Sequence, residues 1–308
     1  MREPWVVGVL LAGLLLGGCG DPASGPGTAV PSGPDTSAPT RQRAPAPPVS
    51  PASPAAPAST PREAPRVLYL GDSLAMENQQ VLGQELRREL RAEYTSAPYS
   101  GTTLCDYLEG TAERSLVPAA DKAAALVRRL RPDVVVLQFW GNSWGYTPCM
   151  DGITYDRSPA RYFSRYAADA RRLTEQIAAA GRGAGPEIVW VAQGPDPITP
   201  DRIRRVNALY AQRAAASGGL VADAGKAVSP AGGRQTWTQY LPCTAAERAR
   251  PGYCTQPSRG RTALHRDDDY LHFCLAPTTS RPKPCPVRSP GILRIARAIT
   301  ETVRQAAR

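Results

Sequence analysis

The sequence predicts an α/β fold in which helices cover both faces of a parallel sheet. Short apolar runs alternate about five times with amphipathic segments over residues 66–308, which is the pattern of βαβ units. The run at 133–140 is almost continuously apolar, as expected for a central parallel strand that is covered on both faces. Ligands bind at the carboxyl ends of such strands, so the residues after each run are the first candidates for a functional site.

Each predicted element follows from a local pattern. The first apolar run ends at Gly71, and the next segment has apolar residues at helical spacing with charges between them. Pro132 ends the second helix, because proline lacks the backbone N–H that a helix needs. The predicted strands span 66–70, 94–99, 133–140, 187–193 and 219–223, and the predicted helices span 74–91, 119–130, 160–180, 202–217 and 290–307.

The N-terminal residues predict export and a lipid anchor. Residues 1–19 contain an early arginine, an apolar stretch that is short for a transmembrane helix, and small residues just before Cys19. This arrangement is typical of a bacterial lipoprotein signal, in which Cys19 becomes the lipidated first residue of the mature protein. An uncleaved anchor helix and an ordinary signal peptide remain as alternatives. The lipoprotein interpretation predicts a protein held at the outer face of the cytoplasmic membrane.

Residues 20–65 predict an extended, solvated tether. They contain 13 prolines among 46 residues and lack the apolar periodicity that a folded core needs. The remaining residues, 66–308, suffice for one α/β domain with a substantial core, which we expect to be monomeric. The net charge of +10 comes almost wholly from arginine. It suits acidic glycans or a membrane surface, and no nucleic-acid-binding motif accompanies it.

Six cysteines remain once Cys19 is assigned to lipidation. An even number in an exported protein indicates disulfides, although the sequence alone does not choose among the pairings. Their spacing is not that of a zinc site, so no metal is expected. Our working hypothesis consists of three pairs, Cys105–Cys149, Cys243–Cys254 and Cys274–Cys285.

Four sequence blocks combine residues suited to acyl chemistry. They contain, in chain order, Ser73, Gly101, Asn142, and Asp269 with His272. A strand-to-helix turn exposes Ser73, and a base must remove its proton to make it a nucleophile. Because Asp269 lies three residues before His272, one short segment can present this base and the carboxylate that orients it. Backbone N–H groups of Ser73 and Gly101, with the amide of Asn142, would complete an oxyanion hole.

Taken singly, each block has an ordinary interpretation as a turn, a helix cap or a surface pair. Together and in this order they resemble the SGNH hydrolase superfamily. Its four named residues would here be Ser73, Gly101, Asn142 and His272.

The resemblance covers residues 66–308, and its third block departs from the family pattern Gly-x-Asn-Asp. Gly141 directly precedes the asparagine, and Ser143 replaces the aspartate. The resemblance implies a flavodoxin-like three-layer α/β/α fold with a five-stranded parallel sheet. It also implies ester hydrolysis or acyl transfer without a cofactor.

Two groups of residues allow more than one interpretation. Trp140, Trp144 and Tyr146 flank the asparagine block and either form a pocket wall or pack together. The segment between Cys243 and Arg266 either holds an anionic polymer or is a solvated loop surface, which we favour. Its arginines are Arg248, Arg250, Arg259, Arg261 and Arg266.

The second histidine of the chain, His265, lies close to Asp267, Asp268 and Asp269. Such a cluster resembles a metal site, but the triad already accounts for Asp269 and its histidine partner. We therefore interpret His265 as a loop residue.

Three functional hypotheses follow from the resemblance and the exported setting. The first is a serine esterase that removes O-acyl groups, such as acetyl, from cell-envelope glycans. The second is an O-acyltransferase that passes the same acyl group to a sugar hydroxyl. The third is a glycan-binding module that keeps the fold without catalysis.

Overall fold

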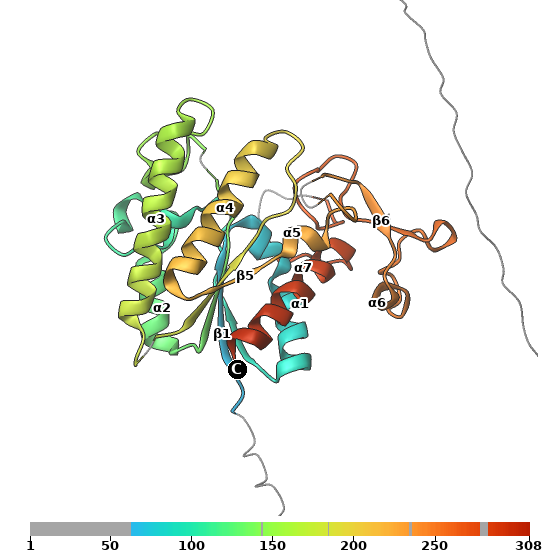
Figure 1. The fold of residues 1–308 in the computed structure, drawn as a ribbon, viewed down its shortest axis with the longest axis horizontal. Coiled ribbons are helices and arrows are strands. Elements are labelled where there is room, and N and C mark those ends of the chain that lie inside the picture. Colours follow the sequence, from blue (N-terminus) through green and yellow to red (C-terminus); the bar gives the residue numbers. More distant parts are fainter. Residues whose placement is uncertain (1–62, 143, 184, 234–235, 278–282) are drawn as a thin grey trace, which may run out of the picture. The chain divides into compact units, whose positions relative to one another are not determined.

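Five parallel strands form the central sheet of the computed structural model, which describes residues 63–308 except 143, 184, 234–235 and 278–282 (Figure 1). The strand order is β2-β1-β3-β4-β5, and every neighbouring pair is parallel. This is the flavodoxin-like order, so the predicted fold class is confirmed. The strands are β1 (Arg66–Gly71), β2 (Glu93–Ser96), β3 (Val134–Gln138), β4 (Glu187–Val191) and β5 (Leu220–Ala222).

Helices cover both faces of the sheet (Figure 1). One layer consists of α1 (Ser73–Leu90), α7 (Pro290–Ala306) and the short α5 (Ala224–Ala227). The other consists of α2 (Ala123–Leu130), α3 (Pro159–Ala180) and α4 (Pro200–Ser217). The predicted helix at 119–130 is divided, because residues 119–121 form a separate 3-10 turn before α2.

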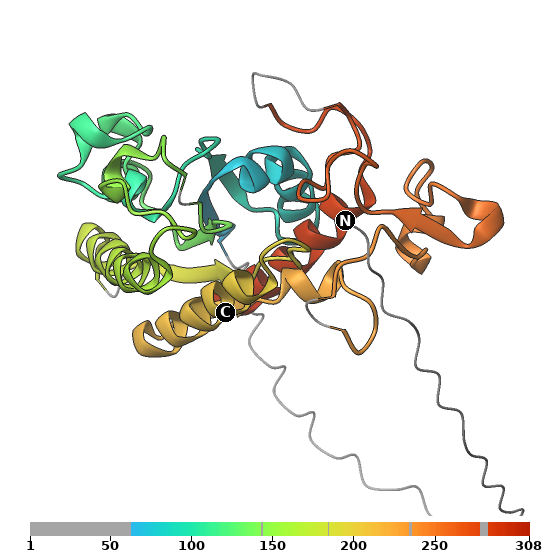
Figure 2. The ribbon, with the colours of Figure 1, turned by 90° about the horizontal axis from the view of Figure 1, so that it is seen from above.

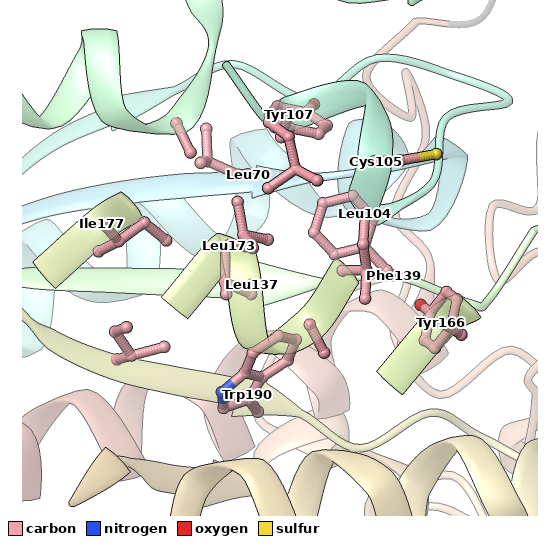
Figure 3. Packing of buried hydrophobic residues seen from close by; sticks show 14 of the residues in the cluster. Leu70, Leu104, Cys105, Tyr107, Leu137, Phe139, Tyr166, Leu173, Ile177 and Trp190 are labelled. Atoms are coloured by element: carbon pink, nitrogen blue, oxygen red, sulfur yellow. The ribbon is translucent and has the colours of Figure 1, made fainter. Parts of the chain in front are cut away.

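Side chains of β1, β3, β4 and β5 alternate between two apolar cores. Leu68 and Leu70 of β1 pack toward α2, α3 and α4, whereas Val67 and Tyr69 pack toward α1 and α7. Figure 3 shows the first of these cores, where Trp190 of β4 lies among leucine and aromatic side chains. All five residues of β3 are buried, as predicted for a central strand that is covered on both faces.

The chain between α5 and α7 contains little regular structure. It includes a two-stranded antiparallel sheet of β6 (Tyr240–Pro242) and β7 (Arg261–Ala263), with α6 (Ala245–Arg248) between them. Figure 2 shows this segment in orange, extending away from the central sheet. These elements were not predicted from the sequence, because three or four residues are too few to show a period.

The structure contains the three predicted disulfides, Cys105–Cys149, Cys243–Cys254 and Cys274–Cys285. The first lies beside the core under α3, and the other two lie in the segment after α5. The predicted signal at 1–19 and almost all of the tether at 20–65 lie outside the described residues. In the part of the chain that the structure describes, no helix is both long enough and apolar enough to span a bilayer.

Candidate active site

The turn between β1 and α1 presents Ser73. A Cβ atom at Gly71 would lie 2.0 Å from the carbonyl oxygen of Gln138 in β3, so only glycine fits this close approach. Asp72 then caps α1, since its Oδ1 accepts the N–H of Leu74 at 3.0 Å. The helix cap is therefore the aspartate and not the serine. Ser73 is the first residue of α1, where backbone N–H groups lack acceptors within the helix.

His272 and Asp269 belong to the C-terminal part of the domain in sequence and lie next to Ser73 in space. Nε2 of His272 lies 3.1 Å from Oγ of Ser73, and Nδ1 lies 3.0 Å from Oδ2 of Asp269. Oδ1 of Asp269 accepts the backbone N–H groups of Leu271 and His272, which holds the turn that separates the two side chains. The three residues have the geometry of a Ser–His–Asp triad. Both contacts lie within hydrogen-bond reach, as proton transfer requires.

The charges around the triad favour a protonated imidazole next to an ionised carboxylate. Burial lowers the pKa of His272, but the hydrogen bond to Asp269 and the charges of Glu77, Asp269 and Asp72 outweigh it, and the net pKa is raised. Burial alone would raise the pKa of Asp269. The side chain and N–H of His272, with the N–H of Leu271, instead hold it well below its usual range. Asp269 is thus suited to stabilise the imidazolium.

Gly101 lies beside Ser73 in the same cavity. Its φ of +75° belongs to the left-handed region, and a Cβ atom there would lie 3.3 Å from the ring of Tyr146. Both this backbone conformation and the nearby Tyr146 ring favour glycine at position 101.

Asn142 lines this cavity too, and three contacts fix its amide. Nδ2 donates to the carbonyl oxygen of Thr102 at 3.0 Å and lies 3.4 Å from Oδ2 of Asp72. Oδ1 accepts the indole N–H of Trp144 at 3.1 Å. Both N–H donors of the amide nitrogen thus have acceptors, and the contact to Asp72 at 3.4 Å is the longer one, which a substrate oxyanion would have to displace.

Asp72 connects two of the blocks. Its Oδ2 accepts the N–H of Trp140 at 2.6 Å and faces the amide of Asn142. Burial raises the pKa of Asp72 to about 6, against the effect of the N–H groups of Trp140 and Leu74. The role of Asp72 was not predicted from the sequence, although a polar residue before the serine is visible in the motif. In the structure it ties the serine turn to the asparagine loop.

The cavity above Ser73 has a volume of about 390 Å³ and mainly apolar walls. Trp144 and Tyr146 line it and are 44% and 61% exposed. Trp140 instead packs beneath, with the guanidinium of Arg202 3.6 Å from its ring centroid. The aromatic group is therefore divided between pocket wall and packing. Further apolar lining residues are Leu271, Ala276, Pro277, Pro284 and Pro286.

His265 lies outside helices and strands, as predicted, but it is a packed residue and only 2% exposed. Its ring lies between Trp237 and Phe273, and Nδ1 contacts the carbonyl oxygen of His272 at 3.0 Å. Burial lowers its pKa. His265 therefore supports the backbone of the triad histidine.

Most arginines of the segment between Cys243 and Arg266 bind within the protein. Arg250 pairs with Glu85 of α1, Arg266 pairs with Asp268, and Arg261 lies over the ring of Tyr240. Arg248 donates to the carbonyl oxygen of Cys243. These contacts fit neither an exposed anion-binding row nor a purely solvated surface.

One group in the described residues has three side chains at metal-ligand distances, namely Cys105, Asp106 and Cys149. Its two sulfur atoms are joined in a disulfide. Thiolates, which are the ligand form of cysteine, are therefore not present in this group.

No family model matches the sequence, and no curated protein matches it. Several solved structures are similar. A family 3 carbohydrate esterase from Clostridium thermocellum is 12% identical with a TM-score of 0.43, over 79% of this chain and 96% of the other. A protein described as lipolytic and of the G-D-S-L family, from Desulfitobacterium hafniense, is 12% identical with a TM-score of 0.43, over 77% and 98%. TesA is 17% identical with a TM-score of 0.34, over 51% and 77%.

Proposed function

We propose that this protein is an SGNH-type serine esterase that acts on O-acyl groups of cell-envelope glycans. The observation that carries the proposal is the hydrogen-bonded chain from Ser73 through His272 to Asp269 at the edge of a mainly apolar cavity. A nucleophile, a base, an orienting carboxylate and oxyanion donors converge on one point, and acyl transfer needs this set.

The proposed reaction begins when Oγ of Ser73 attacks the ester carbonyl carbon and His272 takes the hydroxyl proton through Nε2. Asp269 stabilises the resulting imidazolium. The N–H groups of Ser73 and Gly101 and the amide of Asn142 bind the oxyanion of the tetrahedral intermediate. When the intermediate collapses, the bond between the acyl carbon and the sugar oxygen breaks, and the His272 imidazolium protonates that oxygen, so the sugar leaves as an alcohol and the acyl group stays on Ser73. Water, activated by the same histidine, hydrolyses the acyl-enzyme and restores Ser73.

The proposed glycan substrate is supported by the surface around the cavity. The side chains of Trp144 and Tyr146 are exposed at its wall, and Tyr270 is exposed beside the neighbouring hollow that Trp144 also lines. Flat aromatic faces suit the apolar faces of sugar rings. We further propose that lipidated Cys19 and the tether at 20–65 hold the enzyme at the outer face of the membrane.

Turnover of acetylated glycans tests the proposal, with the protein made under oxidising conditions. Ser73→Ala and His272→Ala are each expected to lower kcat by about 10⁶-fold, because the triad acts as a unit. Undiminished turnover in Ser73→Ala would refute the nucleophile assignment. With an added glycan acceptor, transfer that exceeds hydrolysis would identify an acyltransferase. Glycan binding without turnover of any ester would identify a binding module.

A further inference from the structure

Glu77 is a buried carboxylate at the active site that the reaction above does not use. It lies four residues after Ser73 in α1, so both side chains project from the same face of that helix. It is 5% exposed and lines the same cavity as Ser73 and His272. A buried carboxylate is expensive unless it is paired or hydrogen-bonded, so its contacts indicate what it does.

All the hydrogen bonds described for Glu77 outside its own helix reach the segment that carries the triad histidine. Oε1 accepts the N–H of Phe273 at 2.9 Å, and Oε2 accepts the N–H of Cys274 at 3.2 Å. Its backbone carbonyl oxygen accepts the N–H of Cys285 at 3.2 Å. Because Cys274 and Cys285 are joined in a disulfide, one residue of α1 holds both ends of this loop and the residue directly after His272.

The carboxylate also acts on His272 through its charge. Burial raises the pKa of Glu77 to about 7, and the charge of His272 with the N–H groups of Phe273 and Cys274 opposes this rise. In turn, Glu77 raises the pKa of His272. The other ionisable groups at this site are Asp72, Asp269, His265 and, at the cavity wall, Lys283.

We propose that Glu77 is a positioning residue for His272. Glu77 fixes the backbone directly after His272 and stabilises the protonated form of the His272 imidazole. This inference rests on the proposed function, because it assigns His272 the role of base. It adds a second carboxylate to the one that contacts the ring. Asp269 orients the imidazole through Nδ1, whereas Glu77 holds the chain that brings the imidazole to Ser73.

The first experiment measures the pKa of His272 by NMR titration of the imidazole signals in the full-length protein and in Glu77→Gln. The chain has only two histidines, and His265→Asn assigns the two signals. Loss of the negative charge is expected to lower the pKa of His272. An unchanged pKa would overturn the proposal, and this readout needs no turnover.

A matched control exists on the same helix. Glu85 is 4% exposed and pairs with Arg88 and Arg250, away from the cavity. Glu85→Gln is expected to lower the melting temperature and to leave the pKa of His272 unchanged. If Glu77→Gln behaves like Glu85→Gln in both measurements, its role is structural only and the proposal fails.

The second experiment measures the pH dependence of ester turnover. His272 must be neutral to accept the serine proton, so activity disappears as the pH falls through its pKa. Glu77→Gln is therefore expected to move the acid limb to lower pH and to reduce kcat about tenfold with little change in KM. Glu77→Asp keeps a carboxylate at this position, and its acid limb is expected to lie between those of Glu77→Gln and the wild type. An acid limb and kcat identical to wild type in Glu77→Gln would contradict the proposal.

Failure of the proposed function gives a different result. A fluorophosphonate that labels activated serines is expected to modify Ser73 in the wild-type protein and to do so more slowly in Glu77→Gln. No labelling of the wild type would refute the esterase itself. Labelling of both proteins at equal rates would refute only the role of Glu77.

Discussion

The two ends of the active site are built in different ways. Ser73, Gly101 and Asn142 follow β1, β2 and β3 of the central sheet, and β1 and β3 are buried between two helix layers. Asp269 and His272 lie in a segment with little regular structure, which is held by two disulfides and by polar contacts to α1. The sheet positions its residues through apolar packing. Leu264 and Phe273 of the segment after α5 also pack into the core, but this segment is held in addition by disulfides and buried polar contacts.

The strongest test of this comparison removes packing from the sheet. Trp190 of β4 is fully buried and stacks on Tyr210 at a ring-centroid distance of 4.9 Å. Trp190→Ala is expected to lower the free energy of unfolding by about 3–5 kcal/mol, because a large cavity remains. The kcat per labelled active site is expected to stay close to wild type, since Trp190 does not line the cavity. Urea unfolding and titration of active serines measure the two effects.

A large fall in kcat per labelled site in that variant would contradict the comparison. It would mean that sheet packing controls the geometry of the triad and not only the stability of the fold.

The next test removes the Cys274–Cys285 disulfide from the segment that carries His272. Replacing Cys274 and Cys285 together by serine is expected to lower stability by about 2–4 kcal/mol. It is also expected to reduce kcat, because the chain after His272 loses one of its constraints. The matched control replaces Cys105 and Cys149, whose disulfide lies against the sheet core. Similar loss of stability with little loss of kcat is expected in the control, as judged by thermal unfolding and ester turnover.

If both double variants lost kcat equally, the two regions would not differ in the way described. If neither lost kcat, Glu77 and His265 alone would suffice to hold His272.

The smallest expected effect concerns Asn142, which follows β3 of the central sheet. Trp144→Phe keeps an aromatic wall but removes the indole N–H that Oδ1 of Asn142 accepts. Loss of one such hydrogen bond is expected to reduce kcat/KM by a factor that corresponds to about 1 kcal/mol. Tyr146→Phe is the control, because it keeps the wall and leaves Asn142 untouched. Equal kcat/KM values for the two variants would show that the indole N–H does not orient the amide.

The sheet was predictable because its signals are local. The apolar run that became β3 and the helical spacing of α1 and α3 each lie within one stretch of sequence. The small differences between the predicted and observed strand ends also have local causes. β2 ends at Ser96, and the residues after it lead into the Gly101 turn, where the chain leaves the sheet.

The roles of Glu77 and His265 were not predictable from the sequence. In the sequence pattern of α1, Glu77 cannot be distinguished from an exposed polar residue. Its burial depends on a segment that lies almost 200 residues later in the sequence. His265 contacts Trp237 and Phe273, and no periodicity connects these three residues. Polar contacts between distant segments leave no repeating signal, so the triad was found from residue types and their order instead.

The distance in sequence between Ser73 and His272 has a consequence for the folding of the chain. The base follows the nucleophile by 199 positions, and four of the five sheet strands lie between them. A chain that has formed its sheet but has not yet docked the last segment therefore has a serine without a base. Under the proposed function, such a chain is expected to be inert toward esters. Catalytic competence would then require His272 to dock beside Ser73, so esterase activity is expected to report completed folding.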